Sequence, residues 1–87
     1  MKIVFTEHAL EKFAELKRLG WKLTKAKIRE TIKSPKWRGT SRYGQETAMS
    51  LVDDKHIIRV VFDREDDIII KVITFHIARR GTYESTL

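Results

Sequence analysis

The fold is decided by the last long run of the chain, Ile68-Ile-Ile-Lys-Val-Ile-Thr-Phe-His76-Ile-Ala-Arg79-Arg80-Gly-Thr-Tyr83-Glu84. Its first part is apolar and β-branched, which predicts a strand buried in a sheet. A histidine, two arginines and a tyrosine follow within a few residues. Such groups are costly to bury without partners, so we expect them to emerge at a sheet edge or in a groove. A cationic cluster with a hydroxyl group suits an anionic ligand.

Three further segments before this run have the composition of strands. Residues 56–62 are rich in β-branched side chains, residues 45–52 alternate imperfectly between apolar and polar, and residues 36–39 are compatible with a short strand. Short polar or acidic turns separate these segments. Consecutive strands joined by short turns predict an antiparallel meander.

Two amphipathic helices precede the meander. Thr6 is placed to cap a helix over residues 7–19, and Gly20 is placed to end it. Thr24 is placed to cap a second helix over residues 25–33, which ends before the only proline. A short apolar strand opens the chain. We therefore predict an α+β fold, in which the N-terminal short strand and two helices pack on one face of a small antiparallel sheet.

Composition limits the class of protein. Hydrophobic residues make up 41% of the 87 and charged residues 34%, which predicts one folded domain over residues 1–87. The chain has no cysteine, so disulfides and thiolate chemistry are excluded. The three histidines are too scattered to indicate a metal site, and we expect no cofactor. We also expect no membrane span and no signal peptide, hence a cytoplasmic protein.

Positive charge is concentrated in the first half of the chain. The net charge is +6, and residues 1–44 hold 12 Lys and Arg against 4 Asp and Glu, a balance of +8. Residues 45–87 hold 6 against 8, a balance of −2. A basic half on a small domain indicates a nucleic acid, an acidic protein or an anionic surface as partner. The alternative is that the lysines only keep a small protein soluble.

Short motifs across the chain resemble one superfamily. Arg59-Val60-Val61-Phe62 resembles the arginine-bearing strand of RelE/ParE-type toxins, and Val72-Ile-Thr-Phe followed by Arg79-Arg80-Gly-Thr-Tyr83 resembles their closing strand. Phe5-Thr6-Glu7-His8-Ala9 is more similar to a group of small uncharacterised domains in which Phe-Ser/Thr-x-His-Ala opens the first helix. The BrnT toxins are similar in layout. The resemblance extends over nearly the whole chain.

The resemblance implies an RNA-cleaving toxin, an mRNA interferase, that is neutralised by an antitoxin protein. By position, the roles of the arginines and the C-terminal tyrosine of RelE-like enzymes fall on Arg59, Arg79 and Tyr83. ParE-type relatives act on gyrase instead, so the fold alone does not determine the activity. Residues 45–52 also lack the lysines that contribute to catalysis in RelE.

Metal-independent RNA cleavage requires a base, an acid and cations that stabilise the phosphate. His8 or His76 is the candidate base or acid, because the reference pKa of histidine is near neutral. Arg59 and Arg79, assisted by Arg80, are candidate phosphate ligands, and Tyr83 would position a base or the phosphate. For each there is a structural alternative: a packed or solvent-facing histidine, a charge that protects a sheet edge, or an anchoring ring.

Two pairs of aromatic and cationic residues, Trp37-Arg38 and Arg42-Tyr43, lie between the second helix and the meander. Trp37, Arg38 and Arg42 are therefore candidate nucleic-acid ligands, although Trp37 equally suits a cap on the core. The leading hypothesis is a toxin-like endoribonuclease, or a descendant of one, with RNA and an acidic antitoxin as partners. The alternatives are a non-catalytic nucleic-acid-binding domain and a protein-interaction module. Either a monomer or an edge-strand homodimer is compatible with the pattern.

Overall fold

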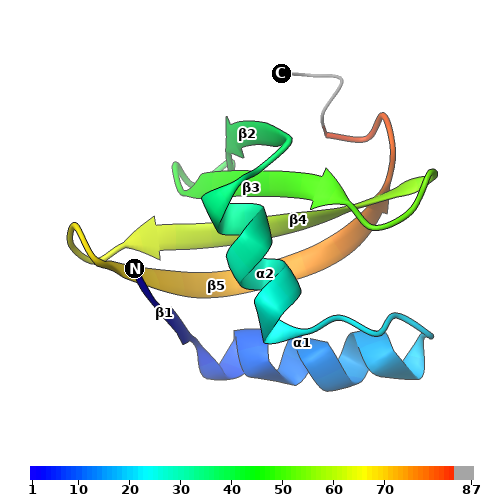
Figure 1. Ribbon diagram of the computed structural model, residues 1–87, viewed down its shortest axis with the longest axis horizontal. Helices are drawn as coiled ribbons and strands as arrows, with labels where there is room; N and C mark the ends of the chain where they lie inside the picture. Colours follow the sequence, from blue (N-terminus) through cyan, green and yellow to red (C-terminus); the bar gives the residue numbers. More distant parts are fainter. Residues whose placement is uncertain (84–87) are drawn as a thin grey trace.

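The computed structural model describes residues 1–83 of the chain as an α+β fold, a mixed sheet with two helices (Figure 1). Its elements, in chain order, are β1 (Lys2–Phe5), α1 (Glu7–Arg18), α2 (Lys25–Lys33), β2 (Trp37–Thr40), β3 (Glu46–Leu51), β4 (His56–Arg64) and β5 (Ile69–Arg79). The predicted α+β class is confirmed, and the predicted elements agree with those observed to within two residues or so at most ends.

The sheet has the strand order β1-β5-β4-β3-β2. Strands β3 to β5 form the predicted antiparallel meander and β2 extends it, but β1 runs parallel to β5, so the prediction of a purely antiparallel sheet is wrong. The Lys2 amide donates to the Ile68 carbonyl at 2.6 Å, and the Thr6 amide donates to the Val72 carbonyl at 3.1 Å. An apolar strand pattern is the same in both directions, so the sequence did not distinguish the two pairings.

Both helices begin at the predicted threonines. The Thr6 hydroxyl accepts from the Ala9 amide at 3.0 Å and also donates to the Ile73 carbonyl at 2.9 Å, which ties the start of α1 to β5. The Thr24 hydroxyl accepts from the Lys27 amide at 3.1 Å. Gly20 follows the end of α1 with a φ of +93°, a conformation that favours glycine.

The hydrophobic core lies between the two helices and one face of the sheet. Helix α1 packs on β5 and β1, while α2 packs on β3 and β4. The buried side chains of this layer are Ala9, Leu16, Ile28, Ile32, Ala48, Ile58, Val60, Phe62, Ile70, Val72 and Phe75. Both helices of the described residues 1–83 therefore cover the same face of the sheet.

A β-bulge in β5 determines which side chains reach the other face of the sheet. Val61 pairs with Thr74 while Phe62 pairs with Val72, so Ile73 is an extra residue in the strand. Val72 faces the core before the bulge and Phe75 faces it afterwards. A bulge shifts the alternation of side chains by one residue. As a result, Thr74 and His76 lie on the face opposite the helices.

Candidate functional site

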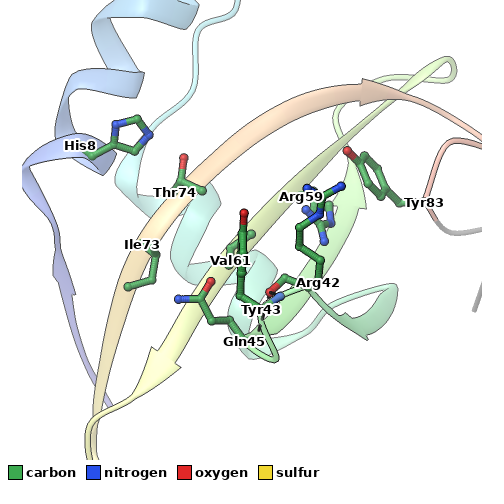
Figure 2. Close-up of a pocket in the computed structure, with 10 residues that line it drawn as sticks. His8, Arg42, Tyr43, Gln45, Arg59, Val61, Ile73, Thr74 and Tyr83 are labelled. Carbon is green, nitrogen blue, oxygen red and sulfur yellow. Dashed lines mark hydrogen bonds between the residues drawn. The ribbon is translucent and has the colours of Figure 1, made fainter.

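A groove of about 730 Å³ opens on the face of the sheet opposite the helices. It is lined by His8, Ser41, Arg42, Tyr43, Gln45, Arg59, Val61, Ile73, Thr74 and Tyr83. These residues come from the start of α1, the turn between β2 and β3, strands β4 and β5, and the segment after β5. In Figure 2, His8 and Thr74 lie at one end of the groove and Arg59 and Tyr83 at the other.

His8 reaches the groove because of how β1 ends. Strand β1 pairs with β5 only as far as Phe5 and Val72, and α1 begins at Glu7 beside the next part of β5. His8, in the first turn of α1, is exposed and lines the groove together with Thr74 (Figure 2). An exposed imidazole at the rim of a groove is accessible for proton transfer to a bound molecule.

Arg59 and Tyr83 form the opposite end of the groove. The Arg59 guanidinium carbon lies 4.4 Å from the centre of the Tyr83 ring, a cation–π contact. Arg59 is half-buried, and no carboxylate in the described part of the chain forms an ion pair with it. A half-buried guanidinium without a carboxylate partner is suited to an anionic ligand.

His76 lies behind this pair, as the cross-strand neighbour of Arg59. Its ring centre is 5.4 Å from that of Tyr83, in an edge-to-face arrangement. Its Nε2 atom is buried and has no hydrogen-bond partner among residues 1–83. Burial lowers the pKa of His76 below its ordinary value of 6.5, and the positive charges of Arg59 and Lys12 lower it further. His76 is therefore neutral at neutral pH.

The lowered pKa of His76 predicts a loss of stability in mild acid. As pH falls below about 6.5, the unfolded chain takes up a proton at His76 before the folded protein does, so the free energy of unfolding decreases. The decrease continues until pH reaches the pKa of His76 in the fold. We expect urea unfolding of the His76→Gln variant to show a flatter pH dependence in this window, and an unchanged slope would contradict the assignment. The pKa of Asp53 is lowered below its ordinary value of 3.8, mainly by the hydrogen bond from the Lys55 amide. Asp53 therefore titrates below the pH window in which His76 takes up its proton in the unfolded chain.

The remaining predicted ligands are divided between the two faces. Arg42 lines the groove. Trp37 pairs with Met49, which is also the cross-strand neighbour of Arg59, so Trp37 shares the groove face without lining the groove. Arg38 pairs with the core residue Ala48 and therefore faces the helix side.

The structure does not bring Arg79 or Arg80 into the groove. Arg79 ends β5 two residues after Ile77, which packs against the core, so its side chain starts on the helix side of the sheet. Arg80 is exposed, and its amide donates to the Lys55 carbonyl at 2.9 Å. Of the five predicted catalytic residues, the groove lining includes His8, Arg59 and Tyr83.

His56 makes structural contacts at the start of β4. Its Nδ1 atom lies 3.0 Å from an Asp53 carboxylate oxygen, and its ring packs edge-on against Trp21 with 4.8 Å between ring centres. These contacts join the turn after β3 to the loop after α1.

Several residues of the groove lining were not predicted from the sequence. Thr74 is two residues before His76, so strand alternation could have found it. Ser41 carried no signal beyond its place in a predicted turn, and Gln45 none beyond its place at the start of a predicted strand. Gln45 is held by a long hydrogen bond, 3.4 Å, from its side-chain nitrogen to Asp63.

Comparisons with family models, with curated proteins and with solved structures give no match for this chain. Within residues 1–83, no group of three or more His, Cys, Asp or Glu side chains is arranged to hold a metal ion. None of the helices in that range combines the length and the hydrophobicity needed to cross a bilayer. The groove itself is therefore the main indication of function.

Proposed function

We propose that this protein is a toxin-like, metal-independent endoribonuclease with a RelE/ParE-type fold, and that the groove is its active site. One observation carries the proposal. His8, Arg59 and Tyr83 come from three distant parts of the chain, yet all line one groove of about 730 Å³. Small-molecule sites range from about 300 to 1,000 Å³, so the groove is large enough for a nucleotide.

The proposed reaction uses the 2′-hydroxyl of RNA as the nucleophile. His8 takes the 2′-hydroxyl proton, and the 2′-oxygen attacks the adjacent phosphorus. The bond from phosphorus to the 5′-oxygen breaks, and this oxygen takes a proton from water in the open groove. The hydroxide that remains is neutralised by the proton that His8 took up, which returns His8 to its starting form. The products are a 2′,3′-cyclic phosphate and a 5′-hydroxyl.

The cations of the groove stabilise the transition state. Negative charge builds up on the phosphate oxygens as the 2′-oxygen attacks, and Arg59 can donate two parallel hydrogen bonds to them. Tyr83 holds the guanidinium through its ring, and the neutral His76 adds no further positive charge behind it. Arg42 lines the same groove and assists in binding the phosphodiester chain.

A non-catalytic RNA-binding domain is the second candidate. Strand β3 (Glu46–Leu51) contains no lysine or arginine that could act on the phosphate. The Nε2 atom of His76 is buried, and His8 is the histidine in the described groove lining. The groove therefore offers few groups for proton transfer, which favours binding without cleavage. Such a protein would bind single-stranded RNA with strong salt dependence and form no product.

The test is incubation of the purified protein with end-labelled single-stranded RNA in the presence of EDTA. We expect cleavage with a 2′,3′-cyclic phosphate end, and no cleavage of the same oligonucleotide with 2′-deoxy sugars. Loss of general base catalysis in His8→Ala should reduce the rate by about 10²- to 10⁴-fold. Salt-dependent binding without product would overturn catalysis in favour of the second candidate. Neither binding nor product would overturn both and favour a protein partner.

A further inference from the structure

The turn between β2 and β3 holds an aromatic ring in an exposed position. Tyr43 is 80% exposed, more than any other large hydrophobic residue described. Large apolar side chains occur singly on many surfaces, so exposure alone carries no functional meaning. Tyr43 differs from a single exposed side chain in two respects: it lines the groove, and hydrogen bonds hold the turn that carries it.

The backbone of the turn is held by a compact set of hydrogen bonds. The Ser41 hydroxyl accepts from the amides of Tyr43 at 3.3 Å and Gln45 at 3.1 Å. The Ser41 carbonyl accepts from the Gly44 amide at 2.9 Å, and the Ser41 amide donates to the Gln45 carbonyl at 2.8 Å. Gly44 has a φ of +81°, which other residues adopt at a cost. These bonds fix the backbone of the turn, and therefore the point at the groove from which the Tyr43 side chain extends.

The surroundings of Tyr43 are cationic and lie within the groove. Arg42 precedes it on the same turn, and Arg59 lies on the neighbouring part of the lining (Figure 2). Tyr83, the other tyrosine of the groove, already has its ring against Arg59. Tyr43 has no ring or cation contact of this kind in the described part of the chain.

We propose that Tyr43 is a stacking platform for an unpaired nucleobase next to the phosphate bound by Arg42 and Arg59. An exposed aromatic ring that shares a groove with two guanidinium groups combines the two features with which proteins bind single-stranded nucleic acid: base stacking and phosphate contacts. In a duplex the faces of the bases are covered by their neighbours, so the substrate class is single-stranded RNA. This inference rests on the proposed function and adds a base subsite to the same groove.

The test measures binding separately from cleavage. An oligonucleotide with 2′-deoxy sugars, which cannot be cleaved by 2′-oxygen attack, carries 2-aminopurine at one position and is titrated with protein. We expect stacking to quench its fluorescence, and Tyr43→Ala to weaken binding about 5- to 100-fold and remove the quenching. Tyr43→Phe keeps the ring and should bind as the wild type does. Leu19→Ala, at an exposed residue outside the groove lining, is the matched control and should have no effect.

Tyr43→Leu separates stacking from simple apolar contact. If leucine supports binding as well as phenylalanine, or if alanine binds as tightly as the wild type, the inference is wrong. The inference would also be contradicted if binding of duplex nucleic acid depended on Tyr43 as strongly as binding of a single strand. A wild-type protein that binds no single-stranded oligonucleotide would contradict it as well. A wild type that binds through Tyr43 but never cleaves RNA leaves the base subsite standing and overturns the proposed catalysis alone. Cleavage that does not depend on Tyr43 overturns only the base subsite.

Discussion

Replacing Arg59 with alanine should lower the rate of RNA cleavage by about 100- to 1,000-fold, the typical cost of removing one transition-state donor. Arg59 lies mid-strand in β4, is half-buried and has no ion-pair partner within residues 1–83. Its charge is therefore available to the phosphate. Arg59→Lys keeps the charge but loses the planar fork, so it should recover only part of the rate. Cleavage of labelled RNA under single-turnover conditions measures both effects.

Arg79→Ala is the matched control for Arg59→Ala. It removes the same side chain from the neighbouring strand, but on the helix side of the sheet, so its cleavage rate should stay close to that of the wild type. Arg59→Ala should also raise the pKa of His76, because Arg59 is one of the charges that lower it, and histidine NMR titration measures this. Equal loss of activity in the two variants would contradict the placement of the site in the groove.

Replacing Phe75 with alanine should destabilise the protein by about 3–5 kcal/mol, the usual cost of truncating a buried phenylalanine. Phe75 is fully buried directly after the bulge, and its ring centre lies 4.7 Å from that of Phe13 on α1. The free energy of unfolding of ordinary domains is about 5–15 kcal/mol, so the variant should be close to unfolding at room temperature. Urea denaturation followed by circular dichroism measures the difference.

Ile68→Ala controls for the loss of a large apolar side chain. Ile68 precedes the same strand but is 64% exposed, and truncating it should change stability by less than about 0.5 kcal/mol. If Phe75→Ala were as stable as Ile68→Ala, the bulge would not place Phe75 in the core. Thr74 and His76 would then not lie on the face of the sheet opposite the helices either.

Local signals predicted much of the fold. Thr6 and Thr24 were recognised as caps because a hydroxyl before a helical pattern satisfies a free amide of the first turn, and the structure has both bonds. Adjacent residues of a strand point to opposite faces, and Phe75 and His76 lie on opposite faces of β5. The parallel pairing of β1 was missed, because it depends on where the chain returns in space and not on local pattern.

The candidate site was only partly predictable. His8, Arg59 and Tyr83 were chosen for their chemistry and a family resemblance, and their meeting in one groove depends on the tertiary fold. Arg79 was predicted alongside them from the family resemblance, although strand alternation after Phe75 places its side chain on the helix side. The change of apolar alternation from Val72 to Phe75 is the one local sign of the bulge in β5.

The most direct test of the account is a ¹H–¹⁵N NMR titration of the protein with a 2′-deoxy oligonucleotide. Because the groove is proposed to bind the phosphodiester chain, signals of His8, Arg59 and Thr74 should shift together and saturate at one affinity. Arg38 and Arg79, which face the helix side, should change little. Shifts confined to the lysines of α2 or to the helix side, with the groove signals unchanged, would contradict the claim that the groove is the functional site.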